Sequence, residues 1–140
     1  MRQPAQLKNE KELQRKLRDA LIKNNFYAIK IESPFVKGLS DLYVARKGNA
    51  GWIEVKFFKE LSENASIKEK IRKAPTLLQK VFLEAQVKHG IHAFVVAGYY
   101  VEEDGWLKLR YGYQYYNKET YFQVGLSEVE LIDHLRDLMR

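Results

Sequence analysis

Apolar side chains recur at helical spacing near the start of the chain and at alternate positions after it, which predicts one helix followed by three strands. The helix is expected over about residues 6–24, where one stripe holds Leu7, Leu13, Leu17 and Leu21. Period-two alternation predicts the strands, and Pro34 closes the first of them because proline has no N–H to donate. The three strands are expected at 27–33, 41–46 and 52–58.

The second half of the chain continues with helix and strand patterns. A helix is predicted from Thr76 to His89, and the unbroken apolar run 93–97 is typical of a strand buried on both faces. Strand, helix and strand in this order imply a right-handed parallel crossover. One or two strands are expected within 106–116, and a last helix begins at Ser127, a good N-cap. The fold class is therefore mixed α/β, with an αβββαβ order and a β/α tail.

Length and composition limit the number of domains and the classes of site that the protein can contain. A chain of 140 residues with 46% hydrophobic residues is expected to form one domain with one sizeable core. The sequence contains no cysteine, which excludes disulfides, thiolate metal sites and cysteine nucleophiles. No apolar run has the length of a signal peptide or a membrane span, so a cytoplasmic protein is predicted.

The net charge of +6 is concentrated in the first half of the chain. Residues 1–75 hold 17 Lys and Arg against 9 Asp and Glu, a net +8, whereas residues 76–140 hold 7 against 9, a net −2. A basic half suits a polyanion such as nucleic acid, and it is equally expected of an ordinary basic surface. Charge alone leaves both interpretations open.

Three charged residues on the second and third predicted strands form the candidate site. If the intervening loop folds one strand back on the other, facing residue numbers sum to about 97, and Asp41 lies across from Glu54 and Lys56. Two carboxylates this close repel each other, and a divalent cation such as Mg²⁺ or Mn²⁺ offsets the repulsion. Phosphodiester hydrolysis requires a metal-activated water and a nearby positive charge. The same residues also suit an exposed hairpin with surface ion pairs.

The sequence around these residues resembles the PD-(D/E)XK nuclease superfamily and, within it, the VRR-NUC and archaeal Holliday-junction-resolvase branch. The resemblance covers about residues 7–98 and rests on Gly38-Leu39-Ser40-Asp41 followed by Trp52-Ile53-Glu54-Val55-Lys56. Ser40 departs from the family pattern, which has proline before the aspartate. The resemblance implies a restriction-endonuclease-like αβββαβ core with a mixed sheet, to which residues 99–140 add a C-terminal extension within a single domain.

The resemblance also implies roles for the residues of the candidate site. Asp41 and Glu54 would bind Mg²⁺, with Mn²⁺ as a substitute, and the carbonyl of Val55 would add a ligand. Lys56 would orient or activate the attacking water. Gln79, near the start of the crossover helix, would support the site, although Thr76 and Gln79 also have the spacing of a capping box.

A glutamate of the first helix usually completes such a site. Glu10 lies three and seven residues before Leu13 and Leu17, so it is expected to share their inward stripe and is the preferred candidate. Glu12 stays open as the second candidate. An ordinary solvated helix charge is the alternative for either residue.

Nucleic-acid contacts are expected from basic and polar residues near the candidate site. Lys30 and Ser33, on the first strand, would touch a phosphate, and the alternative is that they only occupy a strand edge. Basic residues that follow the third strand would line the path of a DNA backbone, and a solvated loop or helix face is equally expected of them: Lys59, Lys68, Lys70, Arg72 and Lys73.

The tail is rich in aromatic residues, and Tyr111, Tyr113 and Tyr115 alternate on one strand face. Core packing is the first interpretation of this face. A homodimer contact is the second, since the resolvase branch works as dimers and tyrosine is enriched at interfaces. Base stacking is the third.

The function predicted from these features is a metal-dependent endodeoxyribonuclease of DNA recombination or repair. Branched, Holliday-junction-like DNA is the expected substrate, because no readable recognition helix is present and phosphate contacts carry no sequence information. The alternative is a non-catalytic nucleic-acid-binding module on a nuclease scaffold. Two clustered carboxylates facing DNA argue against that alternative, and the sequence leaves RNA open as a target.

Overall fold

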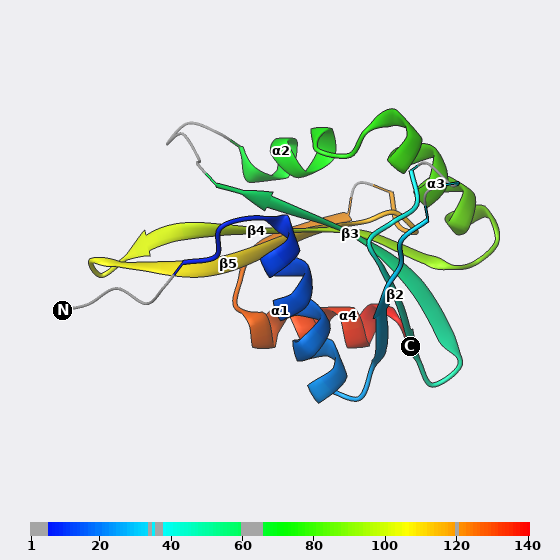
Figure 1. Cartoon of the computed structure of the whole chain (residues 1–140), viewed down its shortest axis with the longest axis horizontal. Coiled ribbons are helices and arrows are strands. Elements are labelled where there is room, and N and C mark those ends of the chain that lie inside the picture. Colours follow the sequence, from blue (N-terminus) through cyan, green and yellow to red (C-terminus); the bar gives the residue numbers. More distant parts are fainter. Residues whose placement is uncertain (1–5, 34, 36–37, 60–65, 120) are drawn as a thin grey trace.

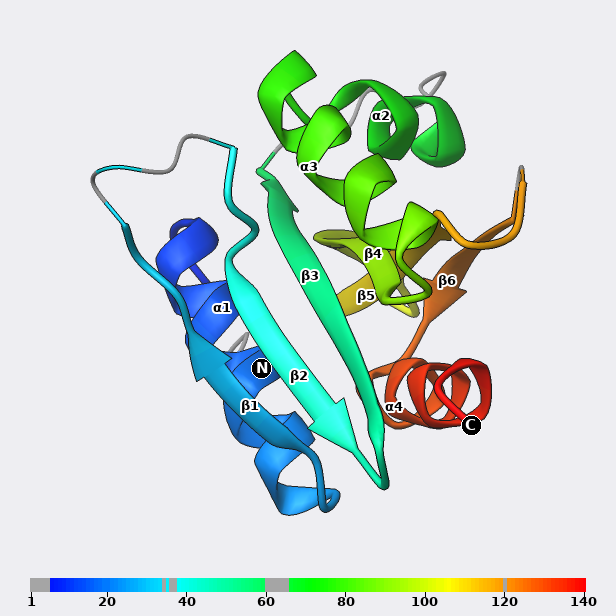
Figure 2. The ribbon, with the colours of Figure 1, turned by 90° about the vertical axis from the view of Figure 1, so that its right-hand side faces the viewer.

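One mixed sheet forms the centre of the molecule in a computed structural model that describes residues 6–33, 35, 38–59, 66–119 and 121–140. Within these residues four helices cover the sheet (Figures 1 and 2). The strands are β1 (Tyr27–Lys30), β2 (Leu42–Arg46), β3 (Asn49–Phe58), β4 (His92–Glu103), β5 (Trp106–Tyr115) and β6 (Tyr121–Leu126). The helices are α1 (Glu10–Lys23), α2 (Ile67–Lys73), α3 (Leu77–Lys88) and α4 (Glu128–Leu138).

The strands lie side by side in the same order as they occur in the chain. Every neighbouring pair is antiparallel except β3 and β4, which are parallel and joined through α2 and α3. The predicted mixed α/β class and αβββαβ order are confirmed, with α2 as an additional helix before the crossover helix α3. The residues after the core continue the same sheet as β5 and β6 and then form α4.

The two faces of the sheet are covered by different helices (Figure 1). Helices α1 and α4 lie on one face, and α2 and α3 lie on the other. Alternation along β3 sends Ile53 and Val55 into the core under α1, whereas Trp52, Glu54 and Lys56 share the face of α2 and α3. The side chains of Glu54 and Lys56 therefore lie on the α3 side of the sheet.

The helices begin where polar caps satisfy free backbone N–H groups. Asn9 caps α1, and both Thr76 and Ser127 form complete capping boxes with the residue three positions later. The first helix therefore begins at Glu10, four residues after the predicted start, because the cap and not the leucine stripe fixes its end. None of the described helices is long and apolar enough to span a membrane.

The turn between β2 and β3 is shorter than the loop predicted near Asn49. Only Lys47 and Gly48 lie between the strands, and both have positive φ, 47° and 84°, as in the tight turns of two-residue hairpins. Facing residue numbers consequently sum to 95, as in the pair Leu42 and Ile53, and not to about 97. The first predicted strand is also shorter, ending at Lys30, and its proposed closure at Pro34 lies outside the described residues.

The aromatic tail is part of the core. Tyr111, Tyr113 and Tyr115 are buried on the face covered by α4 and are exposed by only 1%, 0% and 8%. The hydroxyl of Tyr113 lies 2.8 Å from Nδ1 of His134, and that of Tyr115 lies 2.7 Å from Nδ1 of His92. Core packing, the first of the three interpretations of this face, is therefore confirmed, and these side chains are not available to a partner.

Candidate active site

Asp41 immediately precedes β2 and is fixed by two backbone hydrogen bonds. Its Oδ2 accepts the N–H of Val55 at 2.7 Å, and its carbonyl accepts the N–H of Ile31 at 3.0 Å. Three residues before Asp41 the chain contains Gly38, whose φ is +80°. A Cβ atom at this position would lie 2.6 Å from the carbonyl oxygen of Leu78. Glycine is needed there because the loop packs directly on the start of α3.

Glu54 is the neighbouring carboxyl group, one step along the antiparallel register from the pair Leu42 and Ile53. Its side chain is only 2% exposed, its Oε2 lies 3.4 Å from Nζ of Lys56, and its Oε1 has no hydrogen-bond partner within the described part of the chain. Burial, followed by the charge of Asp41, raises the pKa of Glu54 to about 8, and Lys56 opposes this increase. Without a cation, the site therefore favours a proton on Glu54 at neutral pH.

Lys56 connects Glu54 to the crossover helix. Its Nζ donates to Oε1 of Gln79 at 3.2 Å while it also faces Glu54. The same Gln79 oxygen accepts the backbone N–H of Thr76 at 2.9 Å and completes the capping box. The capping role predicted for Gln79 is thus confirmed, and its contact with Lys56 is compatible with the second role, support of the site, which stays a prediction.

The chemistry of these residues fits a divalent cation. Asp41 lies close enough to Glu54 to raise its pKa beyond the effect of burial, and Oε1 of the buried Glu54 has no partner among the hydrogen bonds of the described residues. Buried polar atoms are nearly always satisfied, so the pair needs either a proton shared between Glu54 and Asp41, which contributes to the raised pKa of Glu54, or a cation in its place. No group of three or more acidic or histidine side chains arranged for a metal occurs in the described residues, so other ligands would come from water, substrate or the backbone, as the predicted Val55 carbonyl would.

The glutamates of α1 are not gathered with this pair. Glu10 is exposed at the first position of the helix, so the expectation that it shares the inward stripe with Leu13 and Leu17 is wrong: that stripe begins only after the first turn. Glu12 accepts the backbone N–H of Lys8 and so contributes to the helix start. A role for either in the site stays a prediction.

The basic residues expected to contact nucleic acid differ in their surroundings. Oγ of Ser33 accepts the backbone N–H of Phe35, and Lys30 pairs with the exposed Glu32 at 3.0 Å. On α2, Glu69 pairs with Arg72 and with Lys73. Lys59, Lys68 and Lys70 form no ion pair within the described chain. The ammonium group of Lys70 lies over the Phe58 ring.

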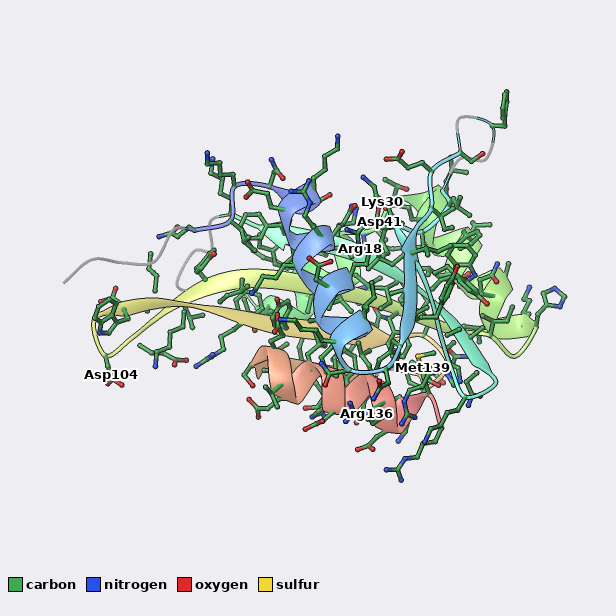
Figure 3. The ribbon with its side chains drawn as sticks, turned by 60° about the horizontal axis from the view of Figure 1, so that its bottom comes forward. Arg18, Lys30, Asp41, Asp104, Arg136 and Met139 are labelled. Atoms are coloured by element: carbon green, nitrogen blue, oxygen red, sulfur yellow. The ribbon has the colours of Figure 1, made fainter. Side chains whose placement is uncertain are left out.

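One binding feature was not predicted from the sequence. A pocket of about 190 Å³, the basic pocket, lies between α1 and the ends of β1 and β2, and it is lined by Lys11, Gln14, Arg15, Arg18, Lys30 and Leu42. Arg18 and Lys30, both labelled in Figure 3, belong to this lining, and Leu42 is the residue after Asp41. The signal was present in the sequence, because Lys11, Arg15 and Arg18 recur at i, i+4 and i+7 on one helix face.

Comparisons with known proteins find a similar fold among solved structures but no similar sequence family. No protein-family model matches the sequence, and no curated protein matches it either. Among solved structures, the chain is similar to Hjc of Archaeoglobus fulgidus, a Holliday junction resolvase from an archaeal hyperthermophile. The two share 24% sequence identity with a TM-score of 0.45, over 71% of this chain and 72% of that one.

Proposed function

We propose that this chain is a metal-dependent endonuclease that hydrolyses phosphodiester bonds in DNA. The observation that carries the proposal is the buried carboxyl of Glu54, held beside Asp41 with one oxygen unpartnered and with Lys56 at 3.4 Å. A buried carboxyl beside a second, half-buried carboxyl is costly to a fold unless something compensates it. A cation shared with a substrate provides that compensation and gives the pair a chemical use.

Each residue has a defined part in this proposal. Asp41 and Glu54 hold the divalent cation, Mg²⁺ or Mn²⁺, with the Val55 carbonyl as a further ligand. The cation would stabilise charge on the phosphate and make a bound water more acidic. Lys56 is placed to hold the attacking water or a phosphate oxygen, and Gln79 keeps the ammonium group at the carboxyl pair. Glu10 is kept as the proposed further ligand, although it is exposed at the start of α1 and is not gathered with the pair in this structure.

The proposed substrate is DNA with a branched structure. The described helices end in ordinary caps and present no motif for reading bases, so contacts are expected to be made to phosphates, which carry no sequence information. A basic first half supports binding to a polyanion. The protein would then select its substrate by the geometry of the DNA branch.

A homodimer belongs to the same proposal, because resolution of a branch requires two cuts. The tyrosine face is buried and excluded as the contact surface. Large apolar side chains are instead exposed at the start of α3, where Leu77, Leu78 and Val81 are exposed by 76%, 53% and 55%. Sedimentation of the wild-type protein and of a Leu77→Ser, Val81→Ser double variant tests this contact, and a monomeric wild-type protein with and without junction DNA rejects it.

Cleavage assays on matched substrates test the function. Supercoiled plasmid, a four-way junction and a duplex of the same arm sequence are incubated with Mg²⁺ or Mn²⁺ and, in parallel, with EDTA. We expect cutting of the junction that disappears with EDTA and in the Asp41→Ala and Glu54→Ala variants. Equal cutting by these variants identifies a contaminant, and metal-dependent binding without any cutting favours a non-catalytic module. A junction cut no faster than its duplex arm rejects branch selectivity.

A further inference from the structure

The basic pocket contains more positive charge than its surroundings neutralise. Four of its six lining side chains are cationic, those of Lys11, Arg15, Arg18 and Lys30. Two of the four have a carboxylate nearby: Lys30 lies 3.0 Å from Glu32, and Arg18 lies 3.6 Å from Asp19. Both carboxylates are mostly exposed, at 74% and 59%, so they lie at the rim and are well screened by solvent.

The other two cations have only looser carboxylate neighbours. After Lys30, Lys11 helps to lower the pKa of the exposed Glu32. Arg15 lies beside Glu12 and Asp19 on the outer side of the helix. Neither Lys11 nor Arg15 forms an ion pair within the residues that the structure describes. Cationic side chains that converge on a pocket repel one another, and the repulsion is relieved when an anion occupies the pocket. The charge of the pocket therefore indicates an anionic ligand.

Gln14 gives a second, independent indication of a ligand. Its side chain lines the basic pocket, is only 8% exposed, and its Oε1 is buried without a hydrogen-bond partner in the described chain. A buried amide normally has its hydrogen bonds satisfied. Exchanging the O and NH₂ ends of this amide, which have nearly the same shape, presents a donor at that position. The amide and the cations together suit a phosphate group, which offers several acceptor oxygens.

The position of the pocket decides which phosphate it would hold. Strand β1 ends at Lys30 and β2 begins at Leu42, and these two residues are register partners. Asp41 is the next residue, and its carbonyl bonds to the N–H of Ile31. The pocket and Asp41 thus lie at the same end of the β1–β2 pair (Figure 3), with the pocket on the α1 side of the sheet and Glu54 on the α3 side.

We propose that the basic pocket binds a backbone phosphate of the same nucleic acid whose scissile phosphate lies at Asp41 and Glu54. This inference rests on the proposed function, and it assigns nucleic-acid binding to Lys11, Gln14, Arg15 and Arg18 in addition to Lys30. The nucleic acid would pass around the end of β1 and β2 and contact both faces of the sheet. The pocket would thereby set the register of the strand relative to the carboxyl pair.

Binding measured without cleavage tests this proposal. A fluorescein-labelled four-way junction and its duplex arm are titrated in EDTA at several NaCl concentrations, with fluorescence anisotropy as the readout. The variants are Arg15→Gln and Arg18→Gln, whose surface helical positions favour retention of the fold, checked by thermal unfolding. The control is Lys23→Gln, which removes one positive charge from an exposed position of the same helix outside the pocket.

We expect each pocket variant to weaken binding several-fold and to lower the slope of log K against log salt by about 1, because one phosphate contact is lost. The Lys23→Gln control is expected to change neither quantity. Wild-type affinity and salt slope in both pocket variants overturn the proposal. An equal loss of affinity in the Lys23→Gln control also overturns it, because binding then depends on the total positive charge of the helix and not on the pocket. Absence of binding to either probe also overturns it.

The outcome is separable from that of the proposed function. Cleavage depends on Asp41, Glu54 and the metal, whereas binding in EDTA depends on the cations of the basic pocket, so the two assays can fail independently. If the chain never cleaves but binds through Arg15 and Arg18, the pocket stands and the nuclease proposal fails. If it cleaves while the pocket variants bind normally, the nuclease proposal stands and the pocket fails.

Discussion

Asp41 is hydrogen-bonded to the strand that carries the other half of the candidate site: its Oδ2 accepts the backbone N–H of Val55 at 2.7 Å. This bond fixes one carboxylate oxygen at the start of β2 and aims the group along the strand toward Glu54. The β2–β3 register, continued by one residue beyond the pair Leu42 and Ile53, brings Asp41 opposite Glu54, so the same contact supports both the fold and the candidate site.

The two functions of Asp41 can be separated by substitution. Asp41→Asn keeps an acceptor for the N–H of Val55 and removes the charge, so we expect near wild-type stability and a loss of cleavage of roughly 100-fold or more. Asp41→Ala also removes the acceptor and leaves that N–H unsatisfied, which costs about 1–3 kcal/mol of unfolding free energy. Urea unfolding and single-turnover cleavage measure the two effects, and equal destabilisation by both variants would show that the hydrogen bond is unimportant.

The raised pKa of Glu54 makes the stability of the metal-free protein depend on pH. The folded state keeps a proton on Glu54 up to about pH 8, whereas the unfolded chain releases it near 4.5. The unfolded state binds fewer protons in this range, so the free energy of unfolding falls as the pH rises from about 4.5 to 8. The total effect is a few kcal/mol, since one pKa unit corresponds to about 1.4 kcal/mol.

Urea unfolding in EDTA between pH 4 and 9 measures this dependence. Glu54→Gln mimics the protonated carboxyl and is expected to flatten the decline, so the variant is more stable than the wild type at pH 9. Glu102→Gln, at an exposed position of β4, serves as the matched control and should keep the wild-type decline. An unchanged decline in Glu54→Gln would mean that another group titrates.

The contact between Lys56 and Gln79 predicts that the crossover helix affects catalysis. Gln79→Ala removes both the partner of Lys56 and half of the capping box, whereas Thr76→Ala disrupts only the cap. We expect both variants to lose about 1 kcal/mol of stability, but only Gln79→Ala to lower the single-turnover rate several-fold. Equal rates in the two variants would reduce Gln79 to a capping residue.

The ammonium group of Lys56 has its own test. Lys56→Met keeps most of the side-chain volume and removes the charge that opposes the increase in the pKa of Glu54. Cleavage is expected to fall by roughly 100-fold and its pH optimum to move upward, while Mn²⁺ binding at high pH is largely retained. Normal cutting by this variant contradicts the role assigned to Lys56.

The choice between Glu10 and Glu12 follows from their surroundings. Glu10 is exposed at the start of α1, so Glu10→Gln should leave the melting temperature unchanged and lower cleavage if it joins the metal site. Glu12 accepts the N–H of Lys8, so Glu12→Gln should lower stability slightly and leave cleavage intact. The reverse pattern would transfer the catalytic assignment to Glu12.

Local patterns in the sequence determined much of this structure. The capping box at Thr76 and Gln79 and the N-cap at Ser127 were predicted where the structure has them, because such caps depend on residues within one turn. The alternation in β3 placed Glu54 and Lys56 on one face, and the apolar run at 93–97 predicted the buried strand. These features require only short-range information.

Properties that depend on distant parts of the chain were less accessible. The strand register was off by two because positive φ at Lys47 permits a turn of two residues, which composition alone does not reveal. The exposure of Glu10 follows from the cap at Asn9, and not from the leucine stripe. The basic pocket requires knowledge that α1 packs beside the ends of β1 and β2, although its helical spacing of cations was visible.

Divalent-metal uptake tests the central claim most directly. Isothermal titration with Mn²⁺ at pH 8 compares the wild-type protein with Asp41→Asn and Glu54→Gln, both of which keep the shape of the site. We expect metal binding by the wild type at millimolar supply or below, with binding abolished or strongly weakened in both variants. Absence of wild-type binding, or undiminished binding by both variants, would contradict a metal held between these carboxyl groups.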